Sequence, residues 1–186
     1  MKQSIFDAKG QRLYVTPEER RRFLRVTKNY PHRERLFCQT LALTGCRITE
    51  ALTLAAEHID RGAKVVVFAT LKQRRSEVFR MVPVPGTYLQ DIQALGGDNN
   101  RQLWPWCRTT GYTLVKDAMR EAGISGPPAS PKGLRHGFAI YALSCGVPLT
   151  LIQKWLGHTS IETTAIYLQA VGAEEYRFAK RMWAAC

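Results

Sequence analysis

Residues 156–167 read LGHTSIETTAIY, and no other part of the chain limits its fold and chemistry as strongly. A helical pattern covers about residues 161–169, and Tyr167 on it lies nine residues after His158. A single tyrosine on an amphipathic helix usually packs in a core, and a single histidine often lies at a helix end or in a loop. The meaning of this pair therefore depends on the rest of the chain.

Two further polar segments precede this stretch. Residues 43–52 read LTGCRITEAL, with Arg47 at the beginning of a short helix expected over residues 47–55. Residues 131–137 read PKGLRHG and open a helix expected over residues 132–144. Arg47 by itself would most often be a surface or helix-capping residue, so its meaning also depends on the other segments.

The remaining pattern predicts an α+β fold that is mainly α, with a small antiparallel sheet. Val-rich and Phe-rich runs at residues 64–70 and 78–84 predict a hairpin whose tip, residues 72–75, reads KQRR. Thr16 and Pro17 open a helix expected to end near residue 29. Further helices are expected over residues 33–44, 87–95, 109–122, 148–156 and 173–183.

Composition indicates a single domain with an anionic partner. The 186 residues suit one domain, and 27 Lys and Arg against 15 Asp and Glu leave a net charge of +12. Such an excess attracts nucleic acid or an anionic membrane surface. The five cysteines form no CxxC pair, and no run of about 18 apolar residues occurs, so we expect a reduced, cytoplasmic protein without membrane insertion.

Taken in order, residues 43–52, Lys72, residues 131–137 and residues 156–167 resemble the tyrosine recombinases, also called phage-type integrases, over roughly residues 16–170. The resemblance implies the catalytic DNA breaking-rejoining fold and site-specific recombination through a 3′-phosphotyrosine intermediate. Most members also have an N-terminal domain that closes over DNA. We expect that domain to be absent and residues 1–186 to form one catalytic domain, either as a fragment or similar in layout to the fimbrial-switch DNA invertases.

The resemblance also implies a role for each site residue. Tyr167 is the expected nucleophile, and Arg47 and Arg135 are expected to clamp the non-bridging oxygens, because a guanidinium matches phosphate bidentately. His158 is expected to add a third donor. Lys72 is implied as the general acid for the leaving 5′-oxygen, although Arg74 and Arg75 lie close to it and a basic tip can also be a solvated loop.

One residue departs from the family pattern, which usually reads His-x-x-Arg where this chain has Lys132 before Arg135. A protonated lysine can contact phosphate but cannot act as a general base, so the proton transfer at this site is in doubt. Glu50 is expected to support the site from behind, with His136 as a plausible partner. A surface pair of Glu50 with Arg47 is the simpler alternative.

The expected partners follow from the same resemblance. They are double-stranded DNA, three further protomers in a homo-tetramer on paired sites, and accessory DNA-bending proteins at the nucleoid. The tail at residues 172–186 is a candidate for exchange between protomers, or for packing on its own domain. No metal or cofactor is expected. Two alternatives stay open: a DNA-binding regulator that has lost efficient cleavage, and a type IB topoisomerase.

Overall fold

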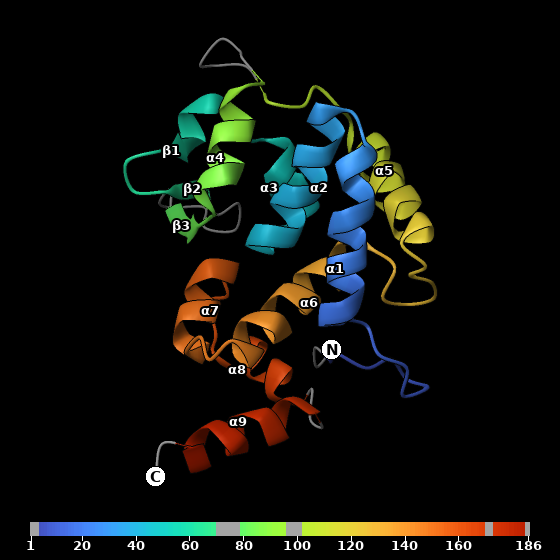
Figure 1. Cartoon of the computed structure of the whole chain (residues 1–186), viewed down its shortest axis with the longest axis vertical. Coiled ribbons are helices and arrows are strands. Elements are labelled where there is room, and N and C mark those ends of the chain that lie inside the picture. Colours follow the sequence, from blue (N-terminus) through green and yellow to red (C-terminus); the bar gives the residue numbers. More distant parts are fainter. Residues whose placement is uncertain (1–3, 70–78, 96–101, 170–172, 185–186) are drawn as a thin grey trace.

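The computed structural model describes residues 4–69, 79–95, 102–169 and 173–184. Helices dominate it, and one small sheet lies beside them (Figure 1). The elements in chain order are α1 (Pro17–Val26), η1 (Thr27–Asn29), α2 (His32–Thr44), α3 (Ile48–Leu52), η2 (Ala56–His58), β1 (Ile59–Asp60), β2 (Val65–Ala69), β3 (Phe79–Pro83), α4 (Gly86–Gln93), α5 (Arg108–Glu121), α6 (Pro131–Ser144), α7 (Leu149–Leu156), α8 (Glu162–Ala165), η3 (Ile166–Gln169) and α9 (Ala173–Ala184). The predicted α+β, mainly α class is confirmed.

The predicted helices occur at the expected places, with three differences in detail. The first begins at its predicted cap, because Thr16 and Glu19 form a capping box, but it changes to the 3-10 turn η1 after Val26. The helix expected over residues 47–55 is shorter and ends at Leu52. The helix expected over residues 161–169 divides into α8 and η3, so Tyr167 lies on a 3-10 turn.

The sheet has the strand order β1-β2-β3, and both pairs are antiparallel. Val66 lies opposite Val82, as the predicted hairpin requires, while the two-residue strand β1 was too short to predict. The inner face of β3 carries buried Arg80 and Val82, and the outer face carries exposed Met81. The predicted basic tip at residues 72–75 lies outside the described residues.

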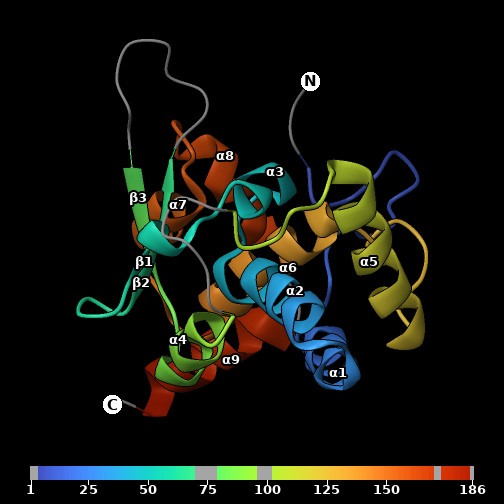
Figure 2. The ribbon, with the colours of Figure 1, turned by 90° about the horizontal axis from the view of Figure 1, so that it is seen from above.

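Two apolar clusters meet at α6. The larger one gathers side chains from α1 to α5 and from the sheet, around Phe37 and Trp104. The smaller one joins α6 to α7 and η3 and includes Phe138 and Tyr167. Figure 2 shows α2 and α6 in the centre, with the sheet on one side and α5 on the other. Since α6 packs against both α2 and η3, it links residues that lie far apart in the sequence.

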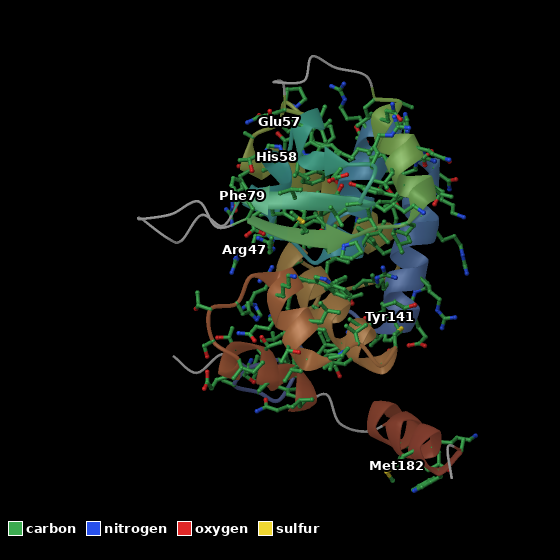
Figure 3. All side chains as sticks on the ribbon, turned by 90° about the vertical axis from the view of Figure 1, so that its left-hand side faces the viewer. Arg47, Glu57, His58, Phe79, Tyr141 and Met182 are labelled. Carbon is green, nitrogen blue, oxygen red and sulfur yellow. The ribbon has the colours of Figure 1, made fainter. Side chains whose placement is uncertain are left out.

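The C-terminal helix α9 lies at one end of the molecule, away from the sheet (Figure 3). It exposes Tyr176 and Trp183, whose rings meet edge to face with centroids 6.0 Å apart. Whether residues 172–186 are exchanged between protomers stays a prediction. Among the described residues, no helix combines the length and the apolar composition that crossing a membrane requires.

Candidate active site

A cavity of about 780 Å³ opens between the beginning of α3, the beginning of α6 and the segment from Gly157 to η3. Lys72 lies outside the described residues, so its position relative to this cavity is not described. The other expected site residues all line the cavity, namely Arg47, Glu50, Lys132, Arg135, His136, His158 and Tyr167.

Arg47 is the N-cap of α3, and its position is fixed by Glu50 one turn later. The backbone N–H of Arg47 donates to Glu50 Oε2 at 2.7 Å, and its Nη1 donates to Glu50 Oε1 at 2.7 Å. The Arg47 side chain is 39% exposed while that of Glu50 is 2% exposed. Figure 3 shows Arg47 at the boundary between the sheet and the helices below it. The guanidinium is thus anchored at one nitrogen and still reaches the cavity.

Glu50 has a second partner that the sequence pattern did not identify, the buried Arg80 of β3. Arg80 Nη2 and Nη1 donate to the two Glu50 oxygens at 2.5 and 3.1 Å, and Arg80 Nε donates to the carbonyl of Trp155 at 2.8 Å. Burial opposes ionisation of Glu50, but the hydrogen bonds and charge of Arg80, and then those of Arg47, hold its pKa below the usual value. Glu50 is therefore a carboxylate that joins α3 to the sheet, and Arg80 extends this network to α7.

A signal for Arg80 was present in the sequence, because it shares the inward side of its strand with Val82 and Val84. A charged residue at an inward position needs a buried partner. The sequence alone did not indicate that the partner is Glu50, which belongs to a helix thirty residues earlier.

Arg135 is buried on α6, where it joins the C-terminal ends of α2 and α7. Its Nη1 donates to the carbonyl of Gly45 at 2.8 Å, and its Nη2 donates to that of Leu156 at 2.7 Å. Gly45 ends α2 in the left-handed region, at φ 61°, and a Cβ there would lie 2.4 Å from the Phe138 ring. Burial, and then the charge of Arg47, lowers the pKa of Arg135 to about 10, which still leaves it protonated at neutral pH.

Tyr167 is 2% exposed, and it lines the cavity together with His136. Tyr167 Oη and His136 Nδ1 share a hydrogen bond of 3.1 Å. Burial raises the pKa of Tyr167 to about 12, and the charges of Arg135 and Arg47 offset only part of this effect. Burial, together with the charges of Lys132 and Arg135, lowers the pKa of His136 to about 4. The resting pair therefore consists of a neutral phenol and a neutral imidazole.

His136 has a different hydrogen-bond partner from the one expected. Its hydrogen bond is with Tyr167 rather than with Glu50, whose oxygens bond to Arg47 and Arg80. Glu50 lies on α3 and Tyr167 on η3, and α6 contacts η3 directly, which brings His136 to the tyrosine.

His158 follows Gly157, which ends α7 in the left-handed region at φ 66°. Its Nδ1 shares a hydrogen bond of 2.9 Å with Thr164 Oγ1, and its ring stacks on that of Tyr167 with centroids 6.3 Å apart. Burial, and then the charges of Arg135 and Arg47, lowers the pKa of His158 to about 3. Thr164 therefore orients a neutral ring, which leaves Nε2 as the nitrogen available for a ligand.

Lys132 and two residues of α5 line the cavity at its other edges. Lys132 is exposed at the beginning of α6, next to the cavity. Arg108 and Tyr112 lie one turn apart on α5 and line the cavity from another side. The sequence pattern did not single them out, because α5 carries no recognisable motif.

The resulting site suits an anion. Glu50 is the one acidic side chain among the described lining residues, and it is paired with two arginines. Within the described ranges, no group of three or more His, Cys, Asp or Glu side chains is arranged to hold a metal ion. The cavity therefore presents cations, neutral histidines and the phenols of Tyr112 and Tyr167, which is a donor set for a phosphodiester.

The fold is that of the catalytic domains of tyrosine recombinases. The crystal structure of XerA recombinase matches it with a TM-score of 0.78 at 22% identity, covering 91% of this chain and 64% of that chain. The catalytic domain of bacteriophage HP1 integrase matches it with a TM-score of 0.67 at 22% identity, covering 90% of this chain and 93% of that chain.

Sequence similarity assigns the family. The sequence profile of the phage integrase family matches residues 14–173, and the chain belongs to this family. Tyrosine recombinase XerA of Pyrococcus furiosus is 30% identical over 167 residues, which cover 82% of this chain and 56% of that protein. Tyrosine recombinase XerD of Mycobacterium tuberculosis is 31% identical over 151 residues, which cover 73% of this chain and 47% of that protein. The chain spans about half the length of the curated relatives it matches.

Proposed function

We propose that this domain cuts and rejoins double-stranded DNA through a covalent bond between Tyr167 and the 3′-phosphate, as part of site-specific recombination. The observation that carries the proposal is the meeting of Tyr167, His158, Arg47 and Arg135 around one cavity. These residues come from three separate segments of the sequence, and packing alone gives no reason for two arginines and a buried phenol to share a cavity.

The two arginines are suited to bind the scissile phosphate. Arg135 uses one N–H of each terminal nitrogen on backbone carbonyls, so three of its five N–H groups stay available. Arg47 is anchored at Nη1 and presents its remaining donors to the cavity. Both guanidiniums are thus oriented before DNA arrives, which is the condition under which such donors stabilise transition-state charge most effectively.

Tyr167 then attacks phosphorus, and the bond to the 5′-oxygen breaks. With its pKa raised to about 12, ionising the phenol at pH 7 costs about 7 kcal/mol. The phenol therefore has to lose its proton during attack, when bound phosphate has already engaged the arginines. His158 Nε2 adds a donor to a non-bridging oxygen, and Lys72 is the proposed acid for the leaving oxygen. The phosphotyrosine conserves the energy of the broken bond, so rejoining by the 5′-hydroxyl needs no nucleotide cofactor.

The assembly and its setting are part of the same proposal. A related structure is described as XerH bound to its difH substrate in a pre-cleavage complex, which supports DNA as the partner here. We infer four protomers on two paired sites, with accessory DNA-bending proteins, acting at the nucleoid in the cytoplasm. The net charge of +12 favours such a polyanionic partner.

The test is a search for covalent protein–DNA adducts. Wild type and Tyr167→Phe are incubated with DNA from the protein's own replicon, both intact and nicked, and then denatured. We expect a 3′-linked adduct with wild type and none with the variant, and sequencing the attached DNA locates the site.

Two outcomes would contradict the proposal. DNA binding without any adduct would favour a regulator that does not cleave, and Lys132 would then be the first residue to change to histidine. Relaxation of a plasmid that lacks the located site would favour a type IB topoisomerase.

A further inference from the structure

We propose that His136 is the general base that removes the proton of Tyr167, a role that rests on the proposed function. The usual family histidine is replaced by Lys132, so the chain needs another proton acceptor at this site. His136 Nδ1 lies 3.1 Å from Tyr167 Oη, within direct reach of the proton that must leave.

The surroundings of the pair leave few other routes for this proton. His136 is 5% exposed and Tyr167 is 2% exposed, so little of either side chain meets bulk water. His136 Nε2 is buried and has no hydrogen-bond partner among the described residues. Because no described group accepts a hydrogen bond from Nε2, a protonated ring would not be stabilised there. The ring is therefore neutral at rest, and its Nδ1 can accept the phenolic proton. Burial and the charges of Lys132 and Arg135 lower the pKa of His136, and they therefore also favour the neutral ring.

The two neighbouring candidates are less suitable. The Nδ1 of His158 is occupied by Thr164, and its ring lies nearly parallel to that of Tyr167, at 16°, so the rings stack. Lys132 is exposed, and a protonated ammonium group can donate but cannot accept. Among the described histidines, His136 is the one whose ring nitrogen hydrogen-bonds to the oxygen of the nucleophile.

The proposed step balances in protons and electrons. An oxygen lone pair of Tyr167 forms the bond to phosphorus, and the phenolic proton passes to His136 Nδ1. The bond from phosphorus to the 5′-oxygen breaks with its electron pair, and that oxygen takes a proton from a separate acid. The imidazolium forms while negative charge builds on the phosphoryl oxygens beside it. In the reverse direction, His136 returns its proton to the departing tyrosine oxygen.

Two substitutions separate proton transfer from positioning. His136→Asn keeps an oxygen near the position of Nδ1, so it can still accept the hydrogen bond of Tyr167, but an amide does not take up the proton. His136→Phe keeps the ring and removes the acceptor. His32→Asn, at the exposed beginning of α2, is the matched control.

The readout is the rate of adduct formation on the nicked fragment that wild type identifies, at saturating protein. We expect both His136 variants to lose about 10²-fold to 10⁴-fold in rate. Their DNA affinity and thermal midpoint should stay near those of wild type, and His32→Asn should be unchanged. A fluorinated, more acidic tyrosine at position 167 should restore much of the rate of adduct formation in His136→Asn. In the protein that keeps His136, the same replacement should change the rate little.

Each contrary result has a defined meaning. If His136→Asn keeps a rate within tenfold of wild type while His136→Phe loses it, His136 only positions the tyrosine and the proposal is wrong. If the variants do not stay folded, the deciding measurement uses the protein that keeps His136 and carries fluorotyrosine at position 167. A rate of adduct formation more than tenfold above wild type would mean that loss of the phenolic proton is unassisted, and the proposal would be wrong. If wild type itself forms no adduct, the proposed function fails and this role fails with it.

Discussion

The cavity has two sides that are held in place by different forces. The arginine side, made of Arg47, Glu50 and Arg135 with Arg80 bonded to Glu50 behind them, is fixed by ion pairs and by hydrogen bonds to backbone carbonyls. The tyrosine side, made of His136, His158 and Tyr167, consists of neutral rings positioned by apolar packing, by stacking and by hydrogen bonds to one another and to Thr164.

In the proposed function, each side has a separate task. The arginine side carries permanent charge that is ready to receive a phosphate. On the tyrosine side, burial keeps every group neutral until a phosphate arrives, which protects the phenol from ionising without a substrate. Four predictions test the contrast, from the largest expected effect to the smallest.

Arg135→Lys should remove most activity by breaking the arginine side. A lysine cannot bond both the Gly45 and Leu156 carbonyls and still present a planar fork to phosphate. We expect the rate of adduct formation to fall at least about a hundredfold. Arg21→Lys, at an exposed pair with Glu18, is the control and should keep the wild-type rate. Equal rates for both variants would mean that Arg135 is not part of the phosphate clamp.

Glu50→Ala should cause the largest loss of stability. The substitution leaves the charge of Arg80 without a partner, and the Arg80 side chain is only 3% exposed. Breaking a buried pair in this way typically costs about 3–5 kcal/mol. The measurement is the free energy of unfolding in urea. Glu18→Ala, in an exposed pair, should change it by less than about 1 kcal/mol. A similar small change for both would show that the arginine side is not held by Glu50.

Acid should weaken the tyrosine side before it affects the carboxylates. The folded pKa of His136 is about 4 against an ordinary value of 6.5, so the unfolded chain binds its proton first. This contribution is fully present above pH 6.5 and is lost as pH falls toward 4. It corresponds to about 3 kcal/mol in total and about 2 kcal/mol by pH 5. The charged and titratable groups facing the ring are Lys132, Arg135, His158 and Tyr167.

The matched variant for this prediction is His136→Asn, which cannot titrate. Unfolding free energies measured at pH 7.5, 6 and 5 should fall more steeply for wild type than for the variant. The lowered pKa of His158 acts in the same direction in both proteins, so the difference reports on His136. Parallel slopes would mean that the ring is not kept neutral by the fold.

Arg108→Ala should have the smallest effect, because this residue belongs to neither side. Its exposed guanidinium lines the cavity from α5 and should meet a DNA phosphate. We expect DNA affinity to fall roughly threefold to tenfold and the slope of log affinity against log salt to decrease by about one. Arg120→Ala, near the other end of α5 and paired with Asp117, is the control. Unchanged salt dependence would show that Arg108 makes no phosphate contact.

Much of the fold could be predicted because local rules determine it. The capping box at Thr16 and Glu19, the glycine that ends α2 at Gly45 and the alternation of β3 each act within a few residues. The family also could be predicted, since its polar residues keep their spacing along the chain. These features depend on sequence neighbours, which a single sequence displays.

The sequence by itself therefore determined the family and the fold class, and it predicted a set of site residues that, Lys72 apart, all line the cavity. Only the tertiary structure decided their partners. Arg80 reaches Glu50 across thirty residues, and His136 bonds Tyr167 rather than Glu50. The physical reason is that α6 packs against α2 and η3 at once, so a hydrogen bond between distant segments depends on the packing of the whole domain.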